Sequence, residues 1–187
     1  MSRALSNCIG FDDGPFPRTH RGDVLLVGAV FARTRLDGVL TGRIRKDGAN
    51  ATQRMVQMVA DSQFTGHVRA VLMKGIAVGG FNVVDIHALH EALGAPVLVV
   101  ARKAPDLAAM QRALRRVPGA ARKWRLIERA GAMEPLGRLW VQRAGLSMAQ
   151  ARDLVEATRL HGHLPEPLRV AHLIAGGMVS GVSGGRA

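Results

Sequence analysis

The sequence of 187 residues contains no tyrosine and a single cysteine, Cys8. One cysteine cannot form an intramolecular disulfide or a cysteine-based zinc site, so the chain fits a reducing compartment, and we expect Cys8 to pack in the core. Aromatic residues make up only 4% of the chain. This scarcity argues against an aromatic platform on which single-stranded bases stack.

Long hydrophobic runs are also lacking. The longest apolar runs, such as residues 24–31 and 96–101, are far shorter than the ~18 residues that a membrane span requires. No basic segment leads into an apolar stretch at the N-terminus, as a secretory signal would. We therefore expect a cytoplasmic protein with no membrane partner.

Acidic residues are few beside basic ones: 14 Asp and Glu against 26 Lys and Arg, a formal charge of +12. Such an excess attracts polyanions, and nucleic acid is the expected partner. The alternative is that arginine serves solubility throughout the surface. The basic residues are densest between residues 102 and 129, where the predicted nucleic-acid-binding residues are Arg102, Lys103, Arg112, Arg115, Arg116, Arg122, Lys123 and Arg125.

The length and the pattern of apolar residues predict one domain, residues 1–187, with a glycine-rich flexible tail from about residue 176. Residues 6–11, 24–33 and 39–44 predict three antiparallel strands, the last two joined by a hairpin turn at Asp37-Gly38. A helix follows, started by a capping box of Asn50 and Gln53.

Strands and helices then alternate, which indicates parallel strands. Residues 68–73 and 96–101 predict buried strands, and residues 124–127 an edge segment. Helices are expected after Asn82, which would cap its helix with Asp85 in the first turn, over residues 107–117, after Ser147 and after Pro165. The predicted class is α/β: a mixed sheet with three antiparallel strands followed by parallel strands, and helices on both faces.

Two motifs are weak. Residues 181–185 read G-x-S-x-G, but a nucleophile elbow needs a strand before it and an acid and a histidine after it. His87 and His90 lie in H-x-x-H-E rather than H-E-x-x-H, so a metal role for them is not favoured over partly exposed polar positions.

The acidic residues at strand and helix ends are more informative. Asp12 and Asp13 end the first predicted strand, Asp47 follows the third, and Asp85 begins a helix. Mg²⁺ and Mn²⁺ prefer such hard oxygen ligands gathered from separate elements. We therefore predict a Mg²⁺ or Mn²⁺ site from these four acids, with simple alternatives for two of them: Asp47-Gly48 is also an ordinary turn, and Asp85 also favours the helix dipole.

Four segments together resemble a known family: residues 10–16 (GFDDGPF), 47–48 (DG), 79–85 (GGFNVVD) and 165–172 (PEPLRVAH). They are similar to the prokaryotic endonuclease dU family, which resembles endonuclease V. The resemblance implies a ribonuclease H-like fold, in agreement with the order of strands predicted above.

The resemblance also implies a function: a Mg²⁺-dependent endonuclease acting on deaminated or modified DNA, such as DNA containing uracil or hypoxanthine. Asp12 matches the first-strand metal acid of endonuclease V, Asp47 is a looser counterpart of the acid near the first helix, and His172 lies where a residue beside the metal is expected. At the end of the fourth strand endonuclease V has an acid, whereas this chain has Lys74. We predict Asp12, Asp47, His172 and Lys74 as catalytic, with Lys74 holding phosphate.

Lys74 leaves two other hypotheses open. A lysine in place of a metal ligand fits a non-catalytic nucleic-acid-binding module on the same scaffold. A third possibility is an enzyme on a small phosphorylated or nucleotide substrate, which would not need the basic residues between 102 and 129.

Overall fold

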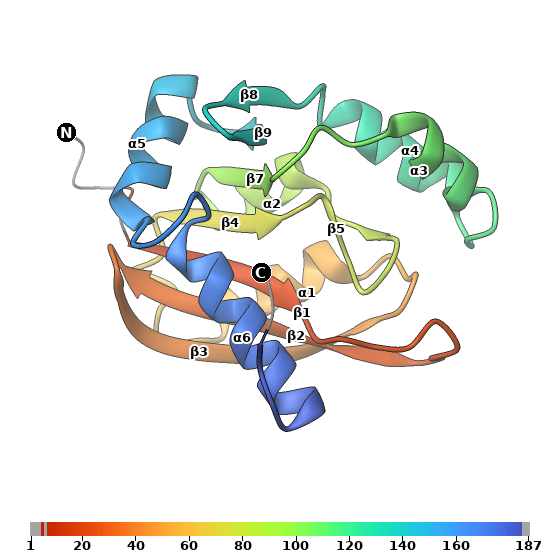
Figure 1. Ribbon diagram of the computed structural model, residues 1–187, viewed down its shortest axis with the longest axis horizontal. Helices are drawn as coiled ribbons and strands as arrows, with labels where there is room; N and C mark the ends of the chain where they lie inside the picture. The colour runs from red at the N-terminus through yellow and green to blue at the C-terminus, as the bar shows by residue number, and fades with distance from the viewer. Residues whose placement is uncertain (1–4, 6, 185–187) are drawn as a thin grey trace.

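A mixed β-sheet runs through the middle of the molecule (Figure 1). The structure is a computed structural model that describes residue 5 and residues 7–184. The strand order is β3-β2-β1-β4-β7-β9-β8. β1, β2 and β3 pair in antiparallel fashion, while β1, β4 and β7 are parallel. The main strands are β1 (Asn7–Asp13), β2 (Asp23–Ala32), β3 (Arg35–Arg45), β4 (Ala70–Lys74), β7 (Val97–Ala101), β8 (Glu134–Leu136) and β9 (Leu139–Ala144), and a separate hairpin comprises β5 (Ala77–Val78) and β6 (Asn82–Val83).

Helices cover both faces of the sheet, as expected. One face packs against α1 (Ala51–Ala60), α2 (Ile86–Leu93) and α4 (Ala120–Arg129), with α3 (Leu107–Leu114) beside α4, and the other face packs against α5 (Met148–Thr158) and α6 (Glu166–Ser180). Alternate residues of β1 enter the two cores: Ile9 and Phe11 face α1 and α2, whereas Cys8 lies in the α5 and α6 core. Cys8 is fully buried, as predicted.

The β2–β3 hairpin turns at Arg33 and Thr34 rather than at Asp37-Gly38. Asp37 instead lies in β3 at a shift in register, where Val30 pairs with Gly38 and Phe31 pairs with Leu36. A bulge of this kind absorbs one extra residue without ending the strand. Gly38 is needed there for another reason: a Cβ at this position would lie 2.3 Å from the ring of Phe64.

The sequence predicted that Asn82 starts a helix, but the structure shows otherwise. It is buried in β6, and its Oδ1 accepts a hydrogen bond from the N–H of Ala51, the first residue of α1. Asp85 caps α2 in its place. Asn50 makes no side-chain cap of its own, so the predicted capping box at α1 is absent.

Two further predictions were wrong near the end of the chain. Residues 124–127 belong to α4 rather than to an edge strand, because Lys123 and Ile127, one helical turn apart, are buried together against the sheet. The hairpin of β8 and β9, which the sequence pattern missed, supplies the sheet edge. The irregular tail does not begin at residue 176, since α6 continues through two glycines to Ser180.

The capping box of Ser147 and Gln150 at the start of α5 and the proline-led start of α6 agree with prediction. Within residue 5 and residues 7–184, no helix is both long and apolar enough to cross a membrane.

Candidate active site

Gly10 determines how closely α6 approaches the sheet. A Cβ on Gly10 would lie 2.5 Å from the backbone carbon of Pro167, so only glycine lets the first turn of α6 rest directly on β1. Asp12 lies two residues beyond Gly10, about 6.6 Å along the strand, and His172 lies five residues beyond Pro167, about 7.5 Å along the helix. The similar advance brings the two side chains side by side.

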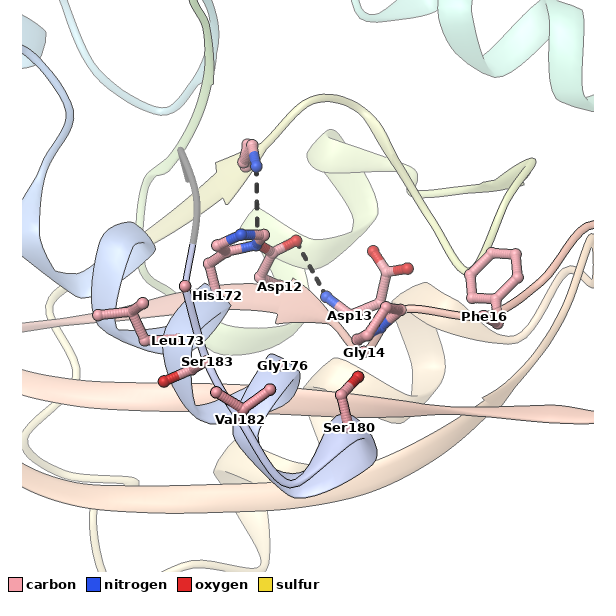
Figure 2. Close-up of a pocket in the computed structure, with 13 residues that line it drawn as sticks. Asp12, Asp13, Gly14, Phe16, His172, Leu173, Gly176, Ser180, Val182 and Ser183 are labelled. Atoms are coloured by element: carbon pink, nitrogen blue, oxygen red, sulfur yellow. Dashed lines mark hydrogen bonds and ion pairs between the residues drawn. The ribbon is translucent and has the colours of Figure 1, made fainter.

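Asp12 and His172 form a close pair. His172 Nδ1 lies 2.9 Å from Asp12 Oδ2, and the other oxygen of Asp12 accepts a hydrogen bond of 3.0 Å from the N–H of Asp13. Asp12 is only 7% exposed, because it points toward α6 as Cys8 does. Figure 2 shows His172 reaching Asp12 from the helix.

Lys74 reaches the same carboxylate from the neighbouring strand. Phe11 and Met73 are register partners in β1 and β4, so the residues that follow them, Asp12 and Lys74, end their strands next to each other. Lys74 Nζ lies 3.9 Å from Asp12 Oδ2. The predicted neighbourhood of Asp12, His172 and Lys74 is therefore present.

Both acids at the end of β1 are held in unfavourable surroundings for negative charge. Burial raises the pKa of Asp12, and the positive charge of Lys74 opposes this effect in part. Burial, and then the charge of Asp12, raise the pKa of Asp13 to about 6, although the N–H of Gly79 lowers it. Adjacent carboxylates that are not fully compensated attract a cation.

These residues line a cavity of about 480 Å³ (Figure 2). Asp12, Asp13, Lys74 and His172 supply its polar side, and Phe16 lies on the loop after β1. The remaining wall comes from the end of α6 and the segment after it, with Ser180, Val182 and Ser183. Phe16 and Ser180 were not predicted, since no short motif marks residues that meet only after α6 has packed on β1, and Ser183 was set aside with the G-x-S-x-G motif.

Asp47 lies outside this cavity and holds a loop. It has a positive φ of 53°, its N–H donates to the carbonyl of Gly79 at 2.8 Å, and its Oδ1 accepts from the N–H of Phe81 at 2.8 Å. Lys123 Nζ donates to the carbonyl oxygen of Asp47. Because Gly79 in turn contacts Asp13, Asp47 fixes the β5–β6 hairpin next to the site without entering it.

Asp85 also lies outside the cavity that Asp12 and Asp13 line. One of its oxygens accepts from the N–H of Ala88 at 3.1 Å, as a helix cap does, and the other lies 2.9 Å from Arg129 Nη1. The predicted cluster of four acids is therefore not formed, and within the part of the chain that the structure describes no three His, Cys, Asp or Glu side chains are grouped to hold a metal ion. Local turn and cap geometry account for Asp47 and Asp85.

The predicted basic residues are mostly exposed, on α3, on α4 and on the segments before and after α3. The exposed members are Arg102, Lys103, Arg112, Arg115, Arg116, Arg122 and Arg125. Lys123 is the exception: it is 3% exposed, and its ammonium group bonds the carbonyl of Asp47. Lys123 is thus a structural residue rather than a nucleic-acid contact, and burial lowers its pKa.

Comparison with known proteins identifies a family that spans nearly the whole chain. A family model described as Endonuclease dU matches residues 5–179. A UPF0215 protein of Deinococcus radiodurans is 54% identical over 97% of this chain and 93% of its own length.

Several solved structures are similar, and two of them illustrate the range of similarity. A protein of unknown function from Archaeoglobus fulgidus has a TM-score of 0.87 at 32% identity and covers 93% of this chain and 98% of its own. Endonuclease V of Ciona intestinalis, solved with a 24mer DNA containing an inosine followed by a ribo-adenosine, has a TM-score of 0.56 at 12% identity, with 89% and 82% covered. The fold of the chain is therefore that of endonuclease V, a ribonuclease H-like fold, as predicted.

Proposed function

The chain belongs to the endonuclease dU family, and on that premise we propose that it is a nuclease that hydrolyses phosphodiester bonds in DNA. The observation that carries the proposal is the meeting of Asp12, His172 and Lys74 in one cavity beside Asp13. This set combines negative groups for a metal ion, a positive group for phosphate and an imidazole that can move a proton. The fold likeness to endonuclease V is consistent with such a role.

A divalent metal fits the acid pair at the end of β1. Mg²⁺ commonly takes only one or two protein carboxylates and completes its shell with water and substrate phosphate oxygens. Asp12 and Asp13 line the same cavity, and burial, followed by the charge of Asp12, raises the pKa of Asp13. We propose that these two residues hold one Mg²⁺ or Mn²⁺, which when bound would polarise the phosphate and lower the pKa of a water molecule.

The protein residues have separate roles in this proposal. Asp12 fixes the ring of His172 through Nδ1, which leaves Nε2 free to accept a proton from water or to return one to the leaving oxygen. Lys74, one-third exposed in its side chain, faces the cavity with a charge for a phosphate oxygen. Asp47 acts as a positioning residue for Asp13 through Gly79.

We propose deaminated or modified DNA as the substrate, with uracil- and hypoxanthine-containing duplexes as the first to test. We expect Mg²⁺-dependent nicks in the modified duplex and little cleavage of the unmodified duplex or of the matching RNA. Asp12→Asn should lose nicking. Nicking by purified Asp12→Asn at the wild-type rate would contradict the assignment.

The alternative of a non-catalytic nucleic-acid-binding module rests on Lys74. Its ammonium group lies 3.9 Å from Asp12 Oδ2, where it already compensates part of the charge that a metal would neutralise. Calorimetric titration with Mn²⁺ separates the two functions. Stoichiometric uptake that Asp13→Asn weakens favours the nuclease, whereas DNA binding with no metal uptake favours the module.

A further inference from the structure

Three arginines and a histidine surround a second, smaller hollow. It has a volume of about 150 Å³ and lies between the β8–β9 turn, α5 and the segment after α5. Its lining includes Arg138, Arg152, Arg159, His163 and one acid, Glu156. No residue is shared with the lining of the catalytic cavity. We refer to this group of three arginines and His163 as the arginine hollow.

The backbone beneath the arginine hollow is firmly held. Leu139, at 4% exposed, and Val155, at 8%, bury their side chains below it. Arg152 lies on α5 and Arg159 directly follows the last residue of α5, and both line the hollow. The capping box of Ser147 and Gln150 fixes the start of this helix.

The three arginines of the hollow have no acidic partner within residue 5 and residues 7–184, whereas Arg129, Arg143 and Arg169 each form an ion pair with an acid. The three arginines outnumber the single acid of the hollow, Glu156, so their positive charges are only partly balanced and repel one another. An anion in the hollow would relieve this repulsion. Guanidinium groups match phosphate oxygens in particular, because their N–H donors form a planar fork.

We propose that the arginine hollow binds one backbone phosphate of a nucleic acid whose cleaved bond lies in the catalytic cavity. This inference rests on the proposed function for the identity of the ligand. A formal charge of +12 favours a polyanion over an isolated phosphate ion.

Strand register relates the arginine hollow to the catalytic cavity. Lys74 pairs with Val100, Val100 pairs with Val141, and the β8–β9 turn follows at the same edge of the sheet. From β1 to β9 there are three strand spacings, about 14 Å. A nucleic-acid strand advances about 3.4 Å per nucleotide, so the bound phosphate is on the order of four to six nucleotides from the cleaved bond.

The test compares two variants with equal loss of charge. One carries Arg138→Gln, Arg152→Gln and Arg159→Gln, and the control carries Arg33→Gln, Arg43→Gln and Arg69→Gln, which are also exposed arginines. Binding of a 20-base-pair duplex is measured in EDTA across a range of salt concentrations, and thermal unfolding checks that both variants fold. We expect about tenfold weaker binding and a salt slope reduced by about one for the first variant, with a smaller change for the control.

Duplex length gives a second readout. A duplex that extends fewer than four base pairs on either side of the cleaved bond does not reach the hollow, so its affinity should fall no more in the first variant than in the control. Equal weakening of both variants, or of both lengths, would overturn the proposal. So would calorimetric binding of inorganic phosphate in wild-type protein together with unchanged duplex affinity in the first variant, which would identify a site for free phosphate.

These binding measurements need no cleavage. If Asp12→Asn and wild type prove equally inactive while the first variant loses duplex affinity, the nuclease assignment fails and the arginine hollow stands. If nicking by the wild type is confirmed and the first variant keeps its duplex affinity, the nuclease assignment stands and the proposed phosphate site in the arginine hollow fails.

Discussion

His172 Nδ1 lies 2.9 Å from Asp12 Oδ2, a contact between residues 160 positions apart in the chain. It joins the last helix of the described chain to the first strand and defines the centre of the proposed site. The pair rests on two separate conditions: Gly10 must let α6 approach, and Asp12 must face the α5 and α6 side of the sheet.

His172→Gln tests the proton-transfer role. Loss of a positioned acid or base lowers kcat by about 10² to 10⁴-fold, and we expect a fall in this range with little change in duplex affinity. His161→Gln, an exposed histidine outside the cavity, is the matched control and should retain wild-type nicking. Equal activity in the two variants would remove His172 from the mechanism.

Gly10→Ala tests the contact between β1 and α6. The added methyl group would lie 2.5 Å from the backbone of Pro167, so α6 must move, at a cost of about 1–3 kcal/mol in the free energy of unfolding. Nicking should fall because His172 moves with the helix. Gly66→Ala is the control, since its Cβ would meet nothing within 4 Å. Chemical denaturation measures both, and matched stabilities would refute the close-packing argument.

Asp13 should make the metal-free protein less stable as the pH rises. Its pKa is about 6 in the folded protein against an ordinary value of 3.8, so between these values the folded state holds a proton that the unfolded state has released. The contribution of Asp13 is therefore most favourable below about pH 3.8, and it declines until about pH 6. In EDTA, the melting temperature of Asp13→Asn relative to wild type should rise between pH 4.5 and 7. A difference that does not change with pH would show that Asp13 titrates normally.

Asp47 distinguishes a hydrogen-bonding role from a metal-binding one. Asp47→Asn keeps an oxygen for the N–H of Phe81, so it should keep most of the nicking activity and stability. Asp47→Ala loses that acceptor and should lower the free energy of unfolding by about 1–3 kcal/mol, with reduced nicking. Asp153→Ala, an exposed acid outside the cavity, is the control. If Asp47→Asn is as inactive as Asp12→Asn, Asp47 is a metal ligand after all.

Much of the fold could be predicted because its signals are local or periodic. The apolar run of residues 96–101 marked a strand covered on both faces, and Ser147 with Gln150 marked the start of α5. The hairpin turn was misplaced because the Asp-Gly sequence suits a bulge as well as a turn. At a bulge the strand accommodates one extra residue and continues. Residues 124–127 were mistaken for a strand because a short apolar segment has no clear period.

The candidate site was predictable only in part. Asp12 and Asp13 were found from their place at a strand end, whereas His172 came from family resemblance, since no local pattern pairs residues so far apart. Asp47 and Asp85 misled because an acid at a turn or a helix start has the same sequence whether it binds a cation or a backbone N–H. Burial decides between these uses, and burial depends on the packed structure.

The position of α6 against β1 has a consequence for biosynthesis. Asp12 leaves the ribosome early, but its partner His172 is made 160 residues later, so a nascent chain cannot assemble the pair until α6 has been synthesised and has docked. Contacts of such long sequence separation form late and slowly in folding. Partly synthesised chains would therefore carry the exposed basic residues of α3 and α4 without the Asp12–His172 pair, and the proposed hydrolysis would begin only once α6 has docked on β1.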